Sequence, residues 1–284
     1  MSIRFDDPLS APQDPDRVNY ANGTLLDEVD FVAEQTYHRN RLARLLAYLQ
    51  GSGTVAGLEV TIDPATPQEL RVAPGLAVDR LGRFIEIPRT WCLQLDAWFS
   101  EQAADPLGQD RMNRAFRAAA GGLPDGVMAD LFVKFAICER GKTPAFGSGN
   151  SDATDAFVAA RLRDSFALEL RIRDQADPLP VPESEFPSLN GLNLTQRRER
   201  VMEYKLQQAW REGSLWRPVG GVLNHDDEHL QDQDGTEVLL ARLRIPATQT
   251  PLELDPNIAV VIDNSLRRLV FSTEELAWIN GIQR

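Results

Sequence analysis

A long amphipathic segment, residues 20–62, constrains the fold of this chain more than any other part of the sequence. Thr24 and Asp27 carry side-chain oxygens that can accept hydrogen bonds from the unpaired N–H groups of a helix start, and Asp30 adds a negative charge that suits the positive end of the helix dipole. Gly51 is a natural C-terminal cap. A helix of roughly 24 residues would be about 36 Å long, whereas helices of globular proteins average about 11–12 residues. We therefore predict a long helix that ends in glycines and turns into strand.

The non-polar side chains of this helix recur at steps of three and four residues and therefore share one face. The face consists of Phe31, Gln35, His38, Leu42, Leu45, Leu46 and Leu49. We predict an interface formed by Phe31, His38, Leu42, Leu45 and Leu49, which is either part of the core or a contact with another helix. For His38, a hydrogen-bonded core or interface histidine is favoured over a catalytic base.

Non-polar and polar residues alternate after the helix, which is typical of strands. Short runs of this kind lie at 58–62, 70–72, 76–78 and 85–87. Residues 79–83 between the last two runs are typical of a hairpin loop in which a glycine supplies a positive φ. These runs predict a small antiparallel sheet beside the helix.

Helical and strand patterns follow one another in the remainder of the chain. Residues 131–139 are non-polar on both faces, which is typical of a strand in the middle of a sheet. A capping box at 272–275 opens a short C-terminal helix. The other predicted elements are a strand-like run at 91–99, helices at 105–122, 153–173 and 194–212, a strand at 238–245, and a hairpin of 258–262 with 269–271. The expected fold class is α+β: a long N-terminal amphipathic helix packed on small antiparallel sheets, with further helices and a C-terminal hairpin plus a short helix.

The chain is acidic, with 42 Asp and Glu against 30 Lys and Arg in 284 residues and a formal charge of -12. This charge argues against nucleic acid or an anionic membrane as the main partner, because both are negatively charged and bind proteins through Lys and Arg. No non-polar run approaches the roughly 18 residues that a membrane helix needs, and the N-terminus lacks the pattern of a signal peptide. We therefore expect a soluble protein that is made in the cytoplasm and does not insert into a membrane.

Residues 1–19 are rich in proline and aspartate and have little to bury, so we expect them to be extended or mobile. They are either a frayed end or an arm that lies on a neighbouring subunit. The predicted organisation is this arm, then the long helix with its small sheet in 20–100, then a mixed α/β remainder in 101–284. The sequence leaves open whether the last two parts form one body.

The two cysteines, Cys92 and Cys138, each lie inside a non-polar, strand-like run. Buried free cysteine behaves as a small hydrophobic residue, so both are predicted to be reduced thiols of the core. No CxxC motif or Cys/His cluster indicates a metal or redox site.

One motif with known chemistry is present: His225-Asp-Asp-Glu228-His229 matches the H-x-x-E-H pattern of inverted zinc peptidases. That chemistry needs a helix to aim both imidazoles at one ion, together with a third ligand and an open coordination site. The residues on both sides have the composition of a loop, so an acidic surface loop is favoured over a metal site. We expect no cofactor and no catalytic constellation.

The long helix and the strands after it carry a recognisable pattern of residues. It reads Asp27-x-x-Asp30-Phe31-x-x-Glu34-Gln35-x-Tyr37-His38-x-x-Arg41-Leu42-x-Arg44, then Gly51-x-Gly53-x-Val55-x-Gly57-Leu58-Glu59-Val60, then Pro74-Gly75-x-Ala77-x-Asp79-x-x-Gly82-Arg83-x-Ile85. This pattern resembles a family of mostly uncharacterised bacterial proteins encoded among phage tail or contractile-injection-system components. The resemblance is strong over 20–88 and looser over 160–170, 240–242 and 263–268. Residues 101–153 and 176–236 fit no pattern of the family.

The resemblance implies a structural part of a tail, baseplate or fibre attachment, and no enzyme activity that can be transferred. We therefore expect a virion or tail-like particle as the location, other tail, baseplate or fibre proteins as partners, and a homo-oligomer. A metal-dependent hydrolase that uses the H-x-x-E-H motif is one alternative. A glycan-binding module is another, and it would need exposed aromatic side chains gathered on one surface. The candidates for that surface are Trp91, Trp98, Trp210, Trp216 and Trp278.

Overall fold

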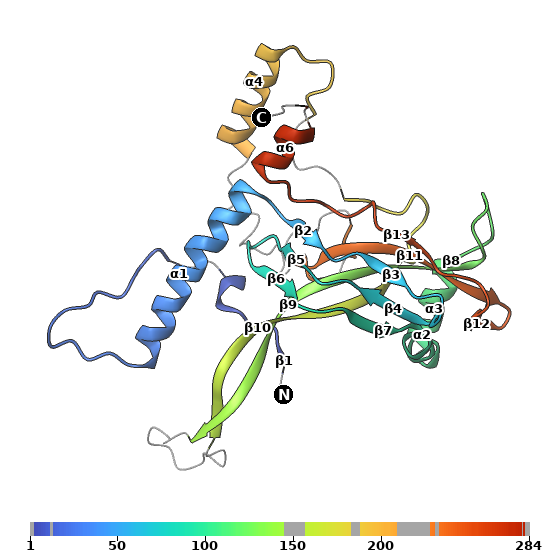
Figure 1. Cartoon of the computed structure of the whole chain (residues 1–284), viewed down its shortest axis with the longest axis horizontal. Helices are drawn as coiled ribbons and strands as arrows, with labels where there is room; N and C mark the ends of the chain where they lie inside the picture. Colours follow the sequence, from blue (N-terminus) through green and yellow to red (C-terminus); the bar gives the residue numbers. More distant parts are fainter. Residues whose placement is uncertain are drawn as a thin grey trace.

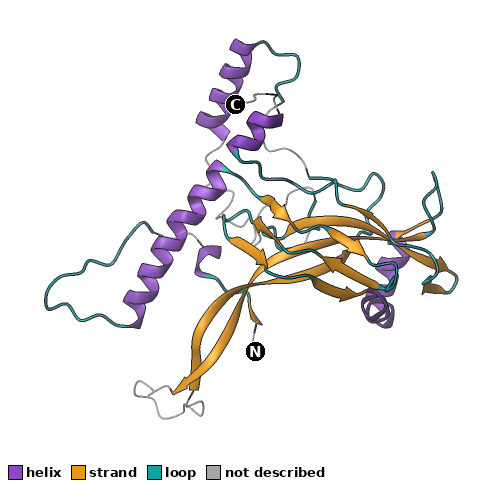
Figure 2. Ribbon diagram, viewed as in Figure 1, coloured by secondary structure: helices purple, strands orange, loops and turns teal. Residues whose placement is uncertain are grey.

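The computed structural model of the chain describes residues 3–11, 14–144, 157–182, 188–208, 228–230, 233–279 and 281. It has the expected α+β fold, with a long N-terminal helix and three antiparallel sheets. Strands form the body of the molecule, and most of the helices lie around its edge (Figure 2).

Strand β9 (Gly126–Pro144) is the centre of the largest sheet. It pairs along most of its length with β10 (Phe157–Ile172) and, on its other side, with β11 (Val238–Gln249). Four short strands complete this sheet: β1 (Ile3–Arg4), β8 (Phe116–Arg117), β12 (Leu252–Leu254) and β13 (Val261–Asp263). Successive residues of β9 are buried on both faces, Leu131, Phe132 and Val133 among them. The prediction of a central strand is therefore confirmed.

Two three-stranded sheets follow the long helix in the chain. One contains β2 (Gly53–Gly57), β5 (Gly75–Val78) and β6 (Phe84–Ile87), and the other contains β3 (Val60–Ile62), β4 (Glu69–Val72) and β7 (Trp91–Gln94). Their non-polar residues share one core with those of β9, β10 and β11. Helices α2 (Leu95–Ala104) and α3 (Pro106–Ala115) contribute Phe99 and Met112 to it. The predicted small sheet is thus two sheets that lie on the large one.

Helix α1 (Glu28–Leu49) is the predicted long helix, and it runs along one side of the molecule (Figure 1). Asp27 caps it in a reciprocal capping box with Asp30, and Gly51 follows its end at a φ of +77°. Farther along the chain lie α4 (Leu194–Glu203), a π-helical turn at Tyr204–Gln208 and α6 (Thr273–Ile279). The predicted capping box of the last helix is confirmed, since Ser272 and Glu275 exchange two hydrogen bonds.

The predicted helix at 153–173 is wrong, because residues 157–172 form β10. Phe166, Leu168, Leu170 and Ile172 recur at steps of two, which is a strand period, and this strand pairs with β9. The competing helical spacing of the earlier residues of this segment led to the wrong prediction.

Several other boundaries also differ from the predictions. The helix predicted at 105–122 ends at Ala115, and the run at 91–99 is strand only as far as Gln94. The regular α-helix predicted at 194–212 ends at Glu203, with residues 209–212 outside the described part. No hairpin joins 258–262 to 269–271: β13 pairs with β11, and Leu269 bridges to Thr54 of β2.

The N-terminal segment is not simply an extended arm. Ile3–Arg4 adds to β9 as β1, and a 3₁₀ turn, η1 (Pro8–Ser10), buries Leu9 to 1% exposure. The expectation that residues 1–19 have little to bury is therefore wrong for 3–11, which lie on their own chain. Residues 14–27 form a long loop that leads to the start of α1 (Figure 1).

Candidate functional site

Helix α1 lies on the body through small and polar residues, not through its non-polar stripe. Its buried residues are Thr36, Asn40 and Ala43. Gly82, in the hairpin loop between β5 and β6, lies very close to the backbone of α1. A Cβ at Gly82 would lie 1.8 Å from the carbonyl oxygen of Ala43. Because Gly82 also has a φ of +83°, glycine is needed both for the turn and for the contact with α1.

Buried charges fix this contact. Arg83 donates to Asp79 at 2.6 Å and to Asp7 at 3.4 Å, and Arg39 of α1 donates to Asp7 at 3.1 Å. Asp79 also accepts the backbone N–H groups of Leu81 and Arg83, both at 2.9 Å. The network ties three segments together: the N-terminal segment, the hairpin loop and α1.

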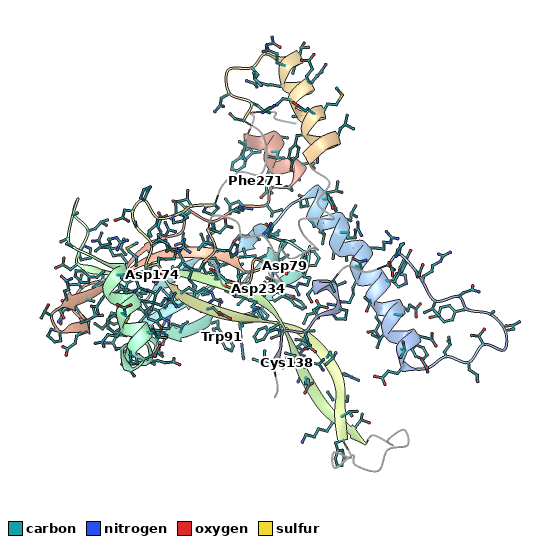
Figure 3. The ribbon with its side chains drawn as sticks, turned by 180° about the vertical axis from the view of Figure 1, so that it is seen from behind. Asp79, Trp91, Cys138, Asp174, Asp234 and Phe271 are labelled. Carbon is teal, nitrogen blue, oxygen red and sulfur yellow. The ribbon has the colours of Figure 1, made fainter. Side chains whose placement is uncertain are left out.

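Burial sets the electrostatics of this network. Desolvation raises the pKa of the Asp79 carboxyl above its ordinary value, although the charge of Arg83 and the backbone donors act in the opposite direction. Desolvation disfavours the charge of Arg83, but Asp79 and Asp7 outweigh it and raise the pKa of that guanidinium. Figure 3 shows Asp79 at the border between the strands and α1.

The predicted interface residues lie on the opposite side of α1. Phe31 is 51% exposed, Leu42 53%, Leu45 54% and Leu49 69%, and His38 is also exposed, with its ring edge-on to Tyr37 at 5.4 Å. The interpretation of this stripe as core is therefore wrong. The other interpretation, a contact with another helix, remains a prediction, and this stripe is the principal candidate site of the molecule.

A second candidate surface lies on the ribbon formed by β9 and β10, which extends beyond the body (Figure 1). Arg140 is directly opposite Arg161, with Arg163 and Lys142 next to them on the same face. None of these four side chains has a hydrogen-bond or ion-pair partner within the part of the chain that the structure describes. A cluster of four unpaired cations is unusual in a chain with a net charge of -12.

An open groove of about 450 Å³ lies at the base of this ribbon. Arg89, Arg140 and Arg163 line it together with Trp91 and Phe166, whose rings meet edge-on at 5.4 Å. Figure 3 shows Trp91 and Cys138 at this base. The sequence did not indicate this surface, because its residues come from the loop before β7 and from the strands β7, β9 and β10.

Glu228 and His229 of the H-x-x-E-H motif are buried, and Glu228–Leu230 form a turn and not a helix. Glu228 pairs with Arg268 at 3.1 Å, and its carbonyl oxygen accepts from Arg173 at 2.8 Å. His229 Nε2 lies 2.9 Å from the carbonyl oxygen of Glu237. The prediction of a surface loop is therefore wrong for these two residues, which tie the segment to the sheet.

The structure offers little room for chemistry beside this turn. His225 lies outside the described residues. The hollow beside Glu228 and His229 measures about 10 Å³, which is the space of roughly one water molecule. Within the described residues, no group of three or more His, Cys, Asp or Glu side chains could hold a metal ion.

The described tryptophans do not gather on one surface. Trp98 is partly buried in the core and donates to the carbonyl oxygen of Leu170 at 3.1 Å. Trp91 on β7 and Trp278 on α6 are exposed, but these elements lie in different parts of the molecule (Figure 1). Trp210 and Trp216 lie outside the described residues.

Only one of the two cysteines is buried. Cys138 lies in β9 as predicted, whereas Cys92 is exposed, so its prediction as a core thiol is wrong. The reason is that β7 forms the edge of its sheet and turns the Cys92 side chain outward.

None of the helices in the described residues combines the length and the non-polar character needed to cross a membrane. The chain matches no model of a known protein family. It also matches no curated protein sequence.

Proposed function

We propose that this chain is a structural assembly protein of a phage tail or a phage-tail-like contractile particle, in the baseplate or where fibres attach. The observation that carries the proposal is the non-polar stripe of α1, which faces away from the body on a helix whose opposite side is fixed to it. An exposed stripe of this kind indicates a contact with another polypeptide. The motif over 20–88 resembles components of such particles, and this resemblance supplies the biological setting.

The shape of the molecule supports a role in assembly. Helix α1, the ribbon of β9 and β10, and helix α4 all project from the strand body (Figure 2). Projecting elements with exposed non-polar or charged side chains are suited to contacts between subunits, with the body holding them in position. In this role α1 would contact other copies, and the cations of the ribbon would contact an acidic surface of a neighbouring protein.

The metal-dependent hydrolase is the second candidate function and has less support. The Glu228 carboxylate pairs with Arg268, and His229 Nε2 contacts the carbonyl oxygen of Glu237, so both side chains have a structural role. The glycan-binding module is supported only by the groove at Trp91, where arginines outnumber aromatic side chains.

Affinity purification of the tagged full-length chain from cells that produce tail-like particles tests the proposal. We expect the chain to purify with other particle proteins. Negative-stain electron microscopy of the purified material should show sheathed or fibre-bearing particles. A double variant, Leu42→Glu with Leu45→Glu, should be absent from the particles although it is expressed. Recovery of particles that lack the wild-type chain would contradict the proposal.

A further inference from the structure

We propose that α1 joins a second copy of this chain in a parallel coiled coil, in which Gln35 and His38 each meet their own counterparts. This inference rests on the proposed function and deepens it. The proposed function requires only that copies of the chain contact one another through α1. The parallel orientation and the register are additional claims.

The stripe has the spacing of a coiled-coil seam. Phe31, Gln35, His38, Leu42, Leu45 and Leu49 follow one another at steps of four, three, four, three and four residues. This alternation is the 3.5-residue period of a heptad repeat, with Gln35, Leu42 and Leu49 at a and the other three residues at d. Four of the six are non-polar, with Phe31 at one end of the seam and Leu42, Leu45 and Leu49 toward the other.

All six seam residues are exposed, so no part of the described chain covers them. The residues on the opposite side of the helix, Thr36, Asn40 and Ala43, are buried against the body. A second α1 can therefore lie along the seam without any movement of the first, and the two bodies would lie on opposite sides of the helix pair. The seam runs from Phe31 to Leu49 and is about 27 Å long.

The polar seam residues favour the parallel orientation. In a parallel pair in register, Gln35 meets Gln35 of the second copy, and each amide can both donate and accept. His38 likewise meets His38, and a neutral imidazole also carries one donor and one acceptor. A centred antiparallel pair would instead place Gln35 against Leu45 and His38 against Leu42, leaving buried polar groups opposite leucine.

The charges beside the seam favour the same orientation. In the parallel pair, Glu34 at position g lies across from Arg39 at position e of the second copy, and the two charges attract. In the antiparallel pair, Arg39 lies near Arg39 of the second copy and Arg41 lies near Arg41 of the second copy. These like charges repel each other. Arg39 uses Nη2 for Asp7, and a guanidinium has five N–H donors in all.

Cysteine cross-linking of the full-length chain tests the orientation. In a Cys92→Ser background, a Leu42→Cys variant on its own can form an inter-chain disulfide only if position 42 meets position 42, as in the parallel pair. A mixture of a Phe31→Cys chain and a tagged Leu49→Cys chain can form a mixed disulfide only in the antiparallel pair. Leu42, Phe31 and Leu49 are exposed in the single chain, so these changes leave its fold intact.

We expect more than half of the Leu42→Cys chain to become a disulfide-linked dimer under mild oxidation, with no mixed product from positions 31 and 49. Formation of the mixed product, or of neither product by a chain that is still oligomeric, would overturn this inference alone. A chain that is monomeric before oxidation would overturn the contact between copies as well, so the two failures can be told apart.

A second variant tests the role assigned to the polar layers. Gln35→Leu with His38→Leu makes the seam non-polar throughout and weakens the preference for the parallel orientation, which then rests on the charges beside the seam alone. We expect association to become roughly tenfold tighter and both cross-links to appear when the cysteines are added. Unchanged affinity with unchanged cross-links would show that Gln35 and His38 do not lie in the contact.

Discussion

At the scale of single residues, Arg83 holds the parts of the N-terminal half together. Its guanidinium is buried between Asp79 and Asp7, and Asp7 in turn accepts from Arg39 of α1. These residues are up to 76 positions apart in the chain. No pattern of the sequence could pair them, because a hydrogen bond between distant segments leaves no periodic trace.

Replacing Arg83 by methionine should destabilise the protein by about 3–5 kcal/mol, because Asp79 and Asp7 would stay buried without their shared cation. Urea denaturation followed by circular dichroism measures the loss. Arg4→Met removes only exposed ion pairs to Asp6 and Glu139 and should cost less than about 1 kcal/mol. Equal losses for the two variants would contradict a special role for Arg83.

Gly82 and Gly23 provide a matched pair for testing the contact between the hairpin loop and α1. Both have a positive φ, +83° and +87°, but a Cβ would strike Ala43 only at Gly82 and would meet open space at Gly23. Gly23→Ala should cost about 1–2 kcal/mol through backbone strain alone. Gly82→Ala should cost about 1–3 kcal/mol more, measured by thermal unfolding, because α1 must move away. Similar costs at the two sites would show that the approach of α1 is not tight.

At the scale of elements, α1 shows what the sequence could and could not predict. The caps at Asp27 and Gly51 and the three- and four-residue steps located the helix correctly. The same steps did not predict which side is buried. Thr36, Asn40 and Ala43 face the body because their small side chains allow backbone atoms to approach closely. The helical period was assigned from non-polar residues alone and therefore could not identify this side as the buried one.

Glutamate at Leu42 and Leu45 should abolish association between copies while leaving the fold of the single chain unchanged, because both side chains are exposed in it. Sedimentation velocity measures association, and thermal unfolding reports on the fold. The control is Val29→Glu, on the same helix but on the other side from the seam and 73% exposed, which should associate normally. Loss of association in the control as well would mean that negative charge alone, and not the seam, is responsible.

The ribbon of β9 and β10 contains a repulsive pair of like charges that can be tested by mutation. Arg161 lies directly opposite Arg140, and like charges in such a pair are unfavourable. Arg161→Glu should therefore stabilise the ribbon by about 0.2–1 kcal/mol, seen as slower hydrogen exchange of its amides. Faster exchange would indicate that Arg161 already has a counter-charge within the chain.

The strand β10 was predicted as a helix because its first residues fit a helical period about as well as a strand period. Tertiary pairing with β9 over 15 residue pairs decides the outcome. The central strand β9 was predicted correctly, because a strand that is non-polar on both faces is buried on both sides only in the middle of a sheet.

At the scale of the whole molecule, a body of strands carries a helix with an exposed non-polar stripe and a ribbon with a cluster of exposed cations. The Glu228 and His229 motif illustrates the opposite case, because residues that resembled a metal site are used to hold a turn on the sheet. The sequence could not separate these possibilities, since the partners Arg173, Glu237 and Arg268 come from other parts of the fold.

The native mass of the purified full-length chain, measured by light scattering across a range of concentrations, tests the contact between copies most directly. A single chain has a mass of 31.7 kDa. We predict a particle whose mass is a multiple of this value for the wild-type chain and a single chain for the Leu42→Glu, Leu45→Glu variant. A wild-type mass of one chain at every concentration would contradict the central claim that α1 joins copies.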